Sequence, residues 1–237
     1  MNINDILYDM RQSGRQQDMR GKGDSGEEAV LQLCLDRKRS VGNGLLFQSF
    51  KYPYQTNRQG QPYIGNIFYD IKTRKFSHVT KDSLEDEIDI LYVTPYRIFA
   101  IEVKSYHTKT IEVYDAWMNR YGEYDDGSGK KKRGTYPVNK SAVAQAEKHA
   151  RHLYHAIYDM IPDGDYRYIV PMVCFVDRCV LRDDRKEELQ EYLPVCILNT
   201  FLATFNKANK PLTYNLDLDK IDRKLHQVCT SIKKELT

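Results

Sequence analysis

Two short apolar runs on either side of a Thr-Pro-Tyr-Arg turn constrain this chain more than any other stretch. Both runs lie within residues 85–105 and are rich in Ile, Val, Tyr and Phe, a pattern typical of the two strands of a β-hairpin. Pro95 suits the second position of a type I turn. With the turn centred between Pro95 and Tyr96, Asp89 lies opposite Glu102. Lys104 follows two residues later, on the same strand face as Glu102.

The three charged residues of this hairpin stand among side chains that are apolar on both faces. Strands of that kind are usually central and buried, and buried charges are unfavourable unless they pair or bind a metal. A divalent cation held by carboxylates can activate water, neutralise a phosphate and stabilise the leaving oxygen. A nearby lysine can orient the attacking water. Asp89, Glu102 and Lys104 therefore indicate phosphodiester hydrolysis, with the main-chain carbonyl of Val103 as a further metal ligand.

Composition limits the classes of protein to which the chain can belong. Its 237 residues, 41% of them hydrophobic, suffice for one large folded domain. The net charge is only +3, so nucleic-acid binding would depend on a local basic cluster. No apolar run approaches the roughly 18 residues of a membrane span, and we expect no membrane partner. Five scattered cysteines without CxxC spacing indicate reduced thiols in a cytoplasmic protein.

The order of predicted elements indicates an α/β fold with a mixed sheet. Residues 1–22 are interpreted as a lead-in and residues 23–237 as a single domain. Ser25 and Glu28 fit a capping box, which predicts that a helix begins near Gly23. We further expect a β-rich insertion at about 45–82, a strand at 110–117, a polar loop at 121–134, an amphipathic helix at 139–160 and a packing or dimerising helix at about 216–236.

Five motifs in order resemble the nuclease-related domain (NERD) family of the PD-(D/E)xK nuclease superfamily. They are a Gly-x-x-Gly-Glu helix start at residues 23–27, Asp89 on a hydrophobic strand, Ile-Glu-Val-Lys at 101–104, a Trp-containing strand around Trp117 and a helix that carries Gln145. The resemblance covers roughly residues 20–200. Ile88-Asp89 stands in place of Pro-Asp. Two departures from the family are the long segment between the first helix and Asp89, which suggests an inserted β element, and Asn139-Lys140 where the family often has Asn-Pro.

The resemblance implies a fold, an activity and a set of site residues. The fold is restriction-endonuclease-like, a mixed central sheet flanked by helices. The activity is metal-dependent hydrolysis of nucleic acid, DNA rather than RNA, with Mg²⁺ or, in its place, Mn²⁺. The catalytic residues are Glu27, Asp89, Glu102, Lys104 and Gln145. The apolar helical neighbours of Glu27 independently predict that it points toward the sheet.

A basic run at residues 130–133 is the local cluster that could contact nucleic acid. Lys130, Lys131, Lys132 and Arg133, with Lys140 nearby in sequence, would hold phosphates without reading bases. A phosphate loop is excluded, because Lys131 stands where that motif needs Ser or Thr. The alternative interpretation is a solvated charge run.

Other interpretations stay open for several residues. Residues 85–87 fit a solvated acidic entry to a strand, and Gln145 fits plain helix surface. His149, His152 and His155 have a helical spacing that could bind zinc, but exposed helix histidines are commoner. For the whole chain, the main alternative is a non-catalytic nucleic-acid-binding module that keeps the nuclease fold, and a nucleotide phosphohydrolase ranks lower. A homodimer is left open.

Overall fold

A six-stranded mixed sheet forms the centre of the molecule. The computed structural model describes residues 19–41, 43–53, 67–70, 75–78, 85–106, 108–114, 118–125, 131–137, 141–176 and 178–236. The strand order is β11-β9-β5-β4-β1-β12, in which β9 and β11 run parallel to β5 and the other neighbours are antiparallel. The strands are β1 (Leu45–Pro53), β4 (Glu85–Val93), β5 (Ile98–Lys104), β9 (Ile169–Phe175), β11 (Val195–Ile197) and β12 (Lys234–Leu236).

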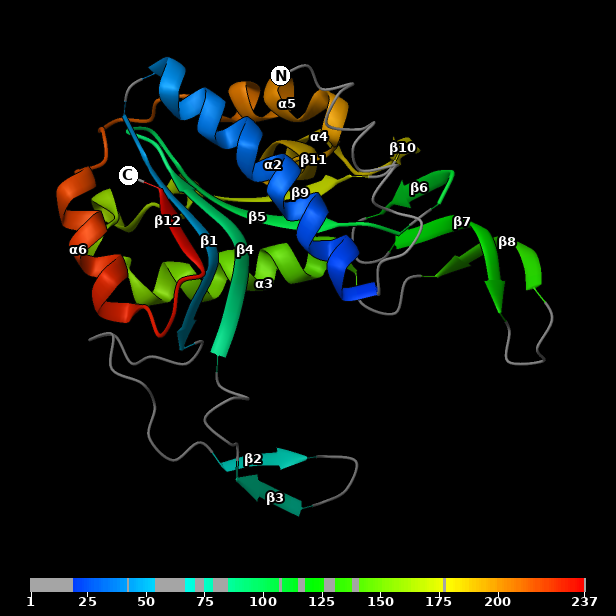
Figure 1. Cartoon of the computed structure of the whole chain (residues 1–237). Coiled ribbons are helices and arrows are strands. Elements are labelled where there is room, and N and C mark those ends of the chain that lie inside the picture. Colours follow the sequence, from blue (N-terminus) through cyan, green and yellow to red (C-terminus); the bar gives the residue numbers. More distant parts are fainter. Residues whose placement is uncertain are drawn as a thin grey trace.

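Helices cover both faces of this sheet, as Figure 1 shows. α2 (Met19–Val41) and α5 (Phe201–Ala208) pack on one face, and α3 (Ala142–Ala156) and α6 (Leu218–Val228) on the other. This arrangement is the restriction-endonuclease-like fold that we predicted. The remaining helical segments are α4 (Glu187–Tyr192), η2 (Tyr158–Met160), η3 (Pro162–Gly164), η4 (Tyr166–Tyr168) and η5 (Leu198–Thr200). Within the described ranges, each helix is too short or too polar to cross a bilayer.

The central hairpin has the predicted register. β4 and β5 pair Ile90 with Ile101 and Val93 with Ile98. The main-chain N–H of Thr94 donates to the carbonyl of Arg97 across the turn (2.8 Å). Strands that lie between two neighbours need apolar side chains on both faces, and β5 is buried from Ile98 to Val103.

A second sheet corrects the prediction of a polar loop at 121–134. Its strand order is β10-β6-β7-β8, and the strands are β10 (Val180–Asp183), β6 (Thr110–Val113), β7 (Met118–Asp125) and β8 (Lys131–Pro137). Asp125 pairs with Lys131 and Asn119 with Pro137. The charged, Gly-rich composition masked a hairpin, because such a composition is typical of loops, whereas here Gly122 of β7 pairs with Gly134 of β8. β2 (Ile67–Asp70) and β3 (Lys75–His78) form a separate two-stranded sheet.

Both ends of the described chain differ from the predicted elements. α2 begins at Met19, so Ser25 lies inside the helix and the capping-box prediction was wrong. Gly26 instead permits close packing, since an added Cβ would lie 2.9 Å from Cγ2 of Val176. α6 ends at Val228, and β12 follows as an edge strand beside β1. β1 itself belongs to the central sheet and not to an insertion.

Candidate functional site

A local break in strand alternation places Asp89 at the edge of the β4–β5 pairing. Ile88 and Ile90 are two residues apart and should share a face, yet Ile88 packs with the α3 and α6 core and Ile90 with the α2 core. In the pairing of β1 with β4, Ser49 and Asp89 stand opposite each other but do not form a ladder pair, and the φ of Ser49 is 51°. The β4–β5 ladder ends at Ile90, so Asp89 lies where the two strands separate.

Beyond the end of the β4–β5 ladder, the Asp89 carboxylate takes the place of a main-chain acceptor on β4. Its Oδ2 accepts the main-chain N–H of Val103 at 2.7 Å. Next to it, the Lys104 ammonium forms an ion pair with Oε1 of Glu102. The Glu102 side chain is 3% exposed and that of Lys104 is 26% exposed, so the pair is reached by solvent from the lysine side. The structure therefore brings together the three hairpin residues that the sequence singled out.

The two hairpin carboxyl groups have different pKa values, because their charged neighbours differ. Burial and the negative charges of Glu102 and Glu27 raise the pKa of Asp89 to about 7, against the opposing effects of Lys104 and the Val103 N–H. Burial also disfavours the ionised form of Glu102, but contacts with His149 and Lys104 outweigh it and lower the pKa of Glu102. Two adjacent carboxyl groups with separated pKa values are typical of functional sites.

The lysine remains an ammonium group in this environment. Burial disfavours its charge, but the carboxylates of Glu102 and Asp89 outweigh burial and raise the pKa of Lys104. A lysine in that state donates hydrogen bonds and offsets negative charge, and it does not accept a proton at neutral pH.

Glu27 lies on α2, which packs on the face of the sheet opposite α3. Its helix α2 buries Val30, Leu31 and Cys34 against the strands, as the apolar stripe predicted. Glu27 itself is half-buried, and its charge acts on the pKa of Asp89. Among the described residues, however, Glu27, Asp89 and Glu102 are not a group whose ligand atoms all lie within 4.8 Å of one another.

Sequence reasoning missed an acid–histidine network on the α3 side. Asp86 is 5% exposed, which contradicts its interpretation as a solvated acid. Its Oδ1 accepts from the Lys148 ammonium at 2.7 Å, and its Oδ2 pairs with Nδ1 of His152. Burial would raise the pKa of Asp86, but His152 and Lys148 lower it. Alternation with Ile88 could have indicated this burial, but the basic partners come from a helix far along the chain.

His149 links this network to the hairpin site. Its Nδ1 lies 3.2 Å from Oε2 of Glu102, and its Nε2 lies 3.9 Å from Oδ1 of Asp86. The His149 side chain is 12% exposed, so it is a largely covered bridge and not a surface histidine. Oε2 of Glu102 is buried and has no hydrogen-bond partner by geometry, although Nδ1 of His149 lies close to it.

The remaining predicted residues are placed only in part. Gln145 lies one helical turn before His149 on α3 and is half-buried, and a catalytic role for it stays a prediction. Residues 131–133 open β8, where the register sets Lys131 opposite Asp125 and Arg133 opposite Glu123. Lys130 and Lys140 lie outside the described residues, as does Trp117.

The donor set fits a hard divalent cation held by few protein ligands. Mg²⁺ is usually bound by one or two carboxylates and keeps several waters. Asp89 and Glu102 supply carboxylate oxygens at the separating strands, and the buried Oε2 of Glu102 lacks a hydrogen-bond partner. Glu27 would then act through its charge or through a water, because its charge acts on the pKa of Asp89 while the three carboxylates form no compact group among the described residues.

Comparison with known proteins agrees with the resemblance drawn from the motifs. The sequence model of one family, described as nuclease-related domain, matches residues 22–176, more than half of the chain. That interval contains Glu27, the β4–β5 hairpin and the histidines of α3. A search of curated proteins and a search of solved structures each returned no match. The chain therefore belongs to the nuclease-related domain (NERD) family.

Proposed function

We propose that this protein is a metal-dependent nuclease that hydrolyses phosphodiester bonds of nucleic acid, DNA rather than RNA. The observation that carries the proposal is the pairing of a high-pKa Asp89 with an ionised Glu102 beside a protonated Lys104, where β4 and β5 separate. Membership of a nuclease-related family supports the same reaction class.

The residues present would divide the reaction among them. Asp89 and Glu102 would hold Mg²⁺, or Mn²⁺ in its place, with the Val103 carbonyl as an additional ligand. The bound cation supplies charge neutralisation of the phosphate and activation of water. The Lys104 ammonium would orient the attacking water and donate to a phosphate oxygen whose negative charge grows during attack. His149 would hold Glu102 in place through its contact with Oε2.

The proposal extends to the partner and to the place where the protein acts. The basic residues Lys130–Arg133 and Lys140 would contact phosphates beside the site and position nucleic acid without reading its sequence. The five scattered cysteines without CxxC spacing support a reducing, cytoplasmic environment.

Cleavage assays with matched variants test the enzymatic proposal. The purified chain would be incubated with plasmid DNA, single-stranded DNA and RNA, with Mg²⁺ and with EDTA. We expect Mg²⁺-dependent cleavage of DNA that Lys104→Ala and Asp89→Asn abolish. Lys109→Ala, an exposed lysine after β5, is the control that should retain activity. The absence of cleavage above the Lys104→Ala background on every nucleic acid would falsify the proposal.

One observation favours the alternative of a non-catalytic nucleic-acid-binding module. Glu27, Asp89 and Glu102 do not form a compact three-carboxylate group in the part of the chain that the structure describes. The alternative predicts binding that weakens with salt, without turnover and without sensitivity to the loss of Asp89 or Glu102. A binding titration of the Asp89→Asn variant alongside the cleavage assay distinguishes the two.

A further inference from the structure

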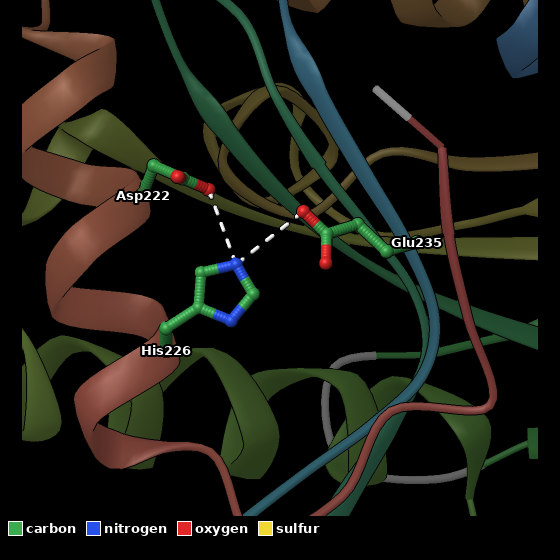
Figure 2. Close-up of side chains that lie close together, drawn as sticks. All are labelled: Asp222, His226 and Glu235. Atoms are coloured by element: carbon green, nitrogen blue, oxygen red, sulfur yellow. Dashed lines mark hydrogen bonds and ion pairs between the residues drawn. The ribbon is translucent and has the colours of Figure 1, made fainter.

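A second group of possible metal ligands lies away from the candidate nuclease site, between α6 and the C-terminal strand. It consists of Asp222, His226 and Glu235 (Figure 2). Asp222 and His226 are four residues apart and lie on one face of α6. Glu235 comes from β12, where it pairs with Phe47 of β1. Cross-strand partners share a face, so Glu235 projects toward the same helix that packs on Phe47.

The three side chains converge on one point. Nε2 of His226 lies 3.6 Å from Oδ1 of Asp222 and 3.3 Å from Oε1 of Glu235. A zinc ion with ligands at about 2.1 Å in tetrahedral geometry separates its ligand atoms by about 3.4 Å. One ligand atom from each residue lies within 4.8 Å of the others. The protein thus already holds the three atoms near the spacing that a shared cation requires.

A single proton cannot satisfy this arrangement. Nε2 of a histidine carries at most one hydrogen, and both carboxylates face that nitrogen, as Figure 2 shows. Glu235 lies within hydrogen-bonding distance of Nε2 at 3.3 Å. Oδ1 of Asp222 is then left as a buried oxygen without a hydrogen-bond partner. A cation that accepts all three lone pairs removes this deficit.

The histidine ring is also held in orientation before any ligand arrives. It packs in a T-shaped arrangement with the ring of Phe47, with centroids 6.0 Å apart and planes at 79°. Phe47 is fully buried, so it is a fixed support. The His226, Asp222 and Glu235 side chains are 43%, 34% and 33% exposed, so solvent can reach the site and complete the coordination.

We propose that Asp222, His226 and Glu235 form a binding site for a divalent transition-metal ion, with Zn²⁺ as the preferred occupant. One imidazole nitrogen with two carboxylates suits Zn²⁺ better than Mg²⁺, which favours oxygen ligands. The bound ion would connect β12 to α6 and hold the short edge strand on the central sheet. This site is independent of the proposed nuclease site, whose residues lie on other elements.

A zinc titration of the whole chain tests this proposal. The chelator-treated protein would be titrated with Zn²⁺ by calorimetry, together with Asp222→Asn, Glu235→Gln and Asp219→Asn. Asp219 is an exposed acid in the first turn of α6 and serves as the matched control. We expect one Zn²⁺ per chain, with affinity lowered at least 10-fold by the first two variants and retained by the control. His226→Ala is a weaker probe, since it also removes packing against Phe47.

The variants also separate this site from other zinc ligands, such as the histidines of α3. Zn²⁺ bound here should slow hydrogen exchange of the β12 amides in the wild-type chain and not in Glu235→Gln. The proposal is overturned if every Zn²⁺-binding event of the wild type persists unchanged in Asp222→Asn and Glu235→Gln, or if the wild type binds no Zn²⁺. Neither result depends on nuclease activity.

Discussion

Two clusters in this protein set a helical histidine between two carboxylates, and they use the imidazole ring differently. His149 of α3 places Nδ1 beside Glu102 and Nε2 beside Asp86. His226 of α6 presents the single atom Nε2 to both Asp222 and Glu235. The first histidine therefore keeps its carboxylates apart and fixes each of them, whereas the second gathers its carboxylates around one point.

Burial sharpens this difference. His149 is 12% exposed, and its partners Glu102 and Asp86 are 3% and 5% exposed. His226 is 43% exposed and its partners are about one-third exposed. Charges withdrawn from water interact strongly and destabilise the fold when left unpaired, while exposed pairs contribute little. Removing a charge should therefore lower fold stability strongly at the α3 cluster. At the α6 cluster it should lower stability only slightly, unless a cation is bound there.

The largest expected effect is the loss of nuclease activity on changing Glu102. Glu102→Gln removes the charge that Lys104 pairs with and that the cation would use, while it keeps the shape of the side chain. We expect Mg²⁺-dependent DNA cleavage to fall at least about 100-fold, the usual effect of deleting one electrostatic contact in an active site. Initial rates on plasmid DNA measure it, with Asp219→Asn as the control. Equal rates for wild type and Glu102→Gln would remove Glu102 from the mechanism.

The next largest effect is a loss of stability at Asp86. Asp86→Ala leaves Lys148, His152 and His149 facing one another without their shared anion. We expect the free energy of unfolding to fall by about 2–3 kcal/mol, less than for a fully buried pair because Lys148 is partly exposed. Urea denaturation of both proteins at the same pH gives the value. A loss below about 0.5 kcal/mol would mean that Asp86 behaves as a solvated acid, as the sequence suggested.

Glu102 and Asp86 also show how much of the candidate site could be predicted from the sequence. The pairing of β4 with β5 was predictable, because a tight turn fixes the register of both strands, and this register leaves Asp89 near Glu102. The role of Asp86 was not predictable, because its burial depends on α3, which packs on β4 from much later in the chain. The strand β12 was missed for a related reason, since its sequence, Lys-Glu-Leu, has no strand pattern of its own and forms a strand only by pairing with β1.

The third effect is a pH dependence that belongs to Asp89. Its pKa of about 7 in the folded chain exceeds the ordinary 3.8, so between these values the native state binds more protons than the unfolded state. The free energy of unfolding should therefore fall as the pH rises from about 4 to about 7, with a slope of at most about 1.4 kcal/mol per pH unit. Glu102 acts in the opposite sense and at lower pH, because its pKa is lowered from 4.5.

Asp89→Asn isolates this contribution. Denaturant unfolding in EDTA at several pH values should give a shallower decline for the variant between pH 5 and 7 than for the wild type. Added Mg²⁺ should reduce the decline in the wild type, because a bound cation favours the ionised carboxylate. Parallel curves for the two proteins in EDTA would show that the Asp89 carboxyl titrates near its ordinary pKa.

The smallest effect completes the comparison at the α6 cluster. In EDTA, Asp222→Asn should change the free energy of unfolding by less than about 1 kcal/mol, because the His226 and Asp222 side chains are 43% and 34% exposed. With Zn²⁺ in excess, the wild type should gain stability in proportion to the logarithm of free Zn²⁺, and the variant should not. Thermal unfolding with and without Zn²⁺ measures both quantities. A loss of several kcal/mol in EDTA would mean that His226 holds its carboxylates as His149 does, and that the single-nitrogen geometry does not by itself distinguish a cation site from a structural ion pair.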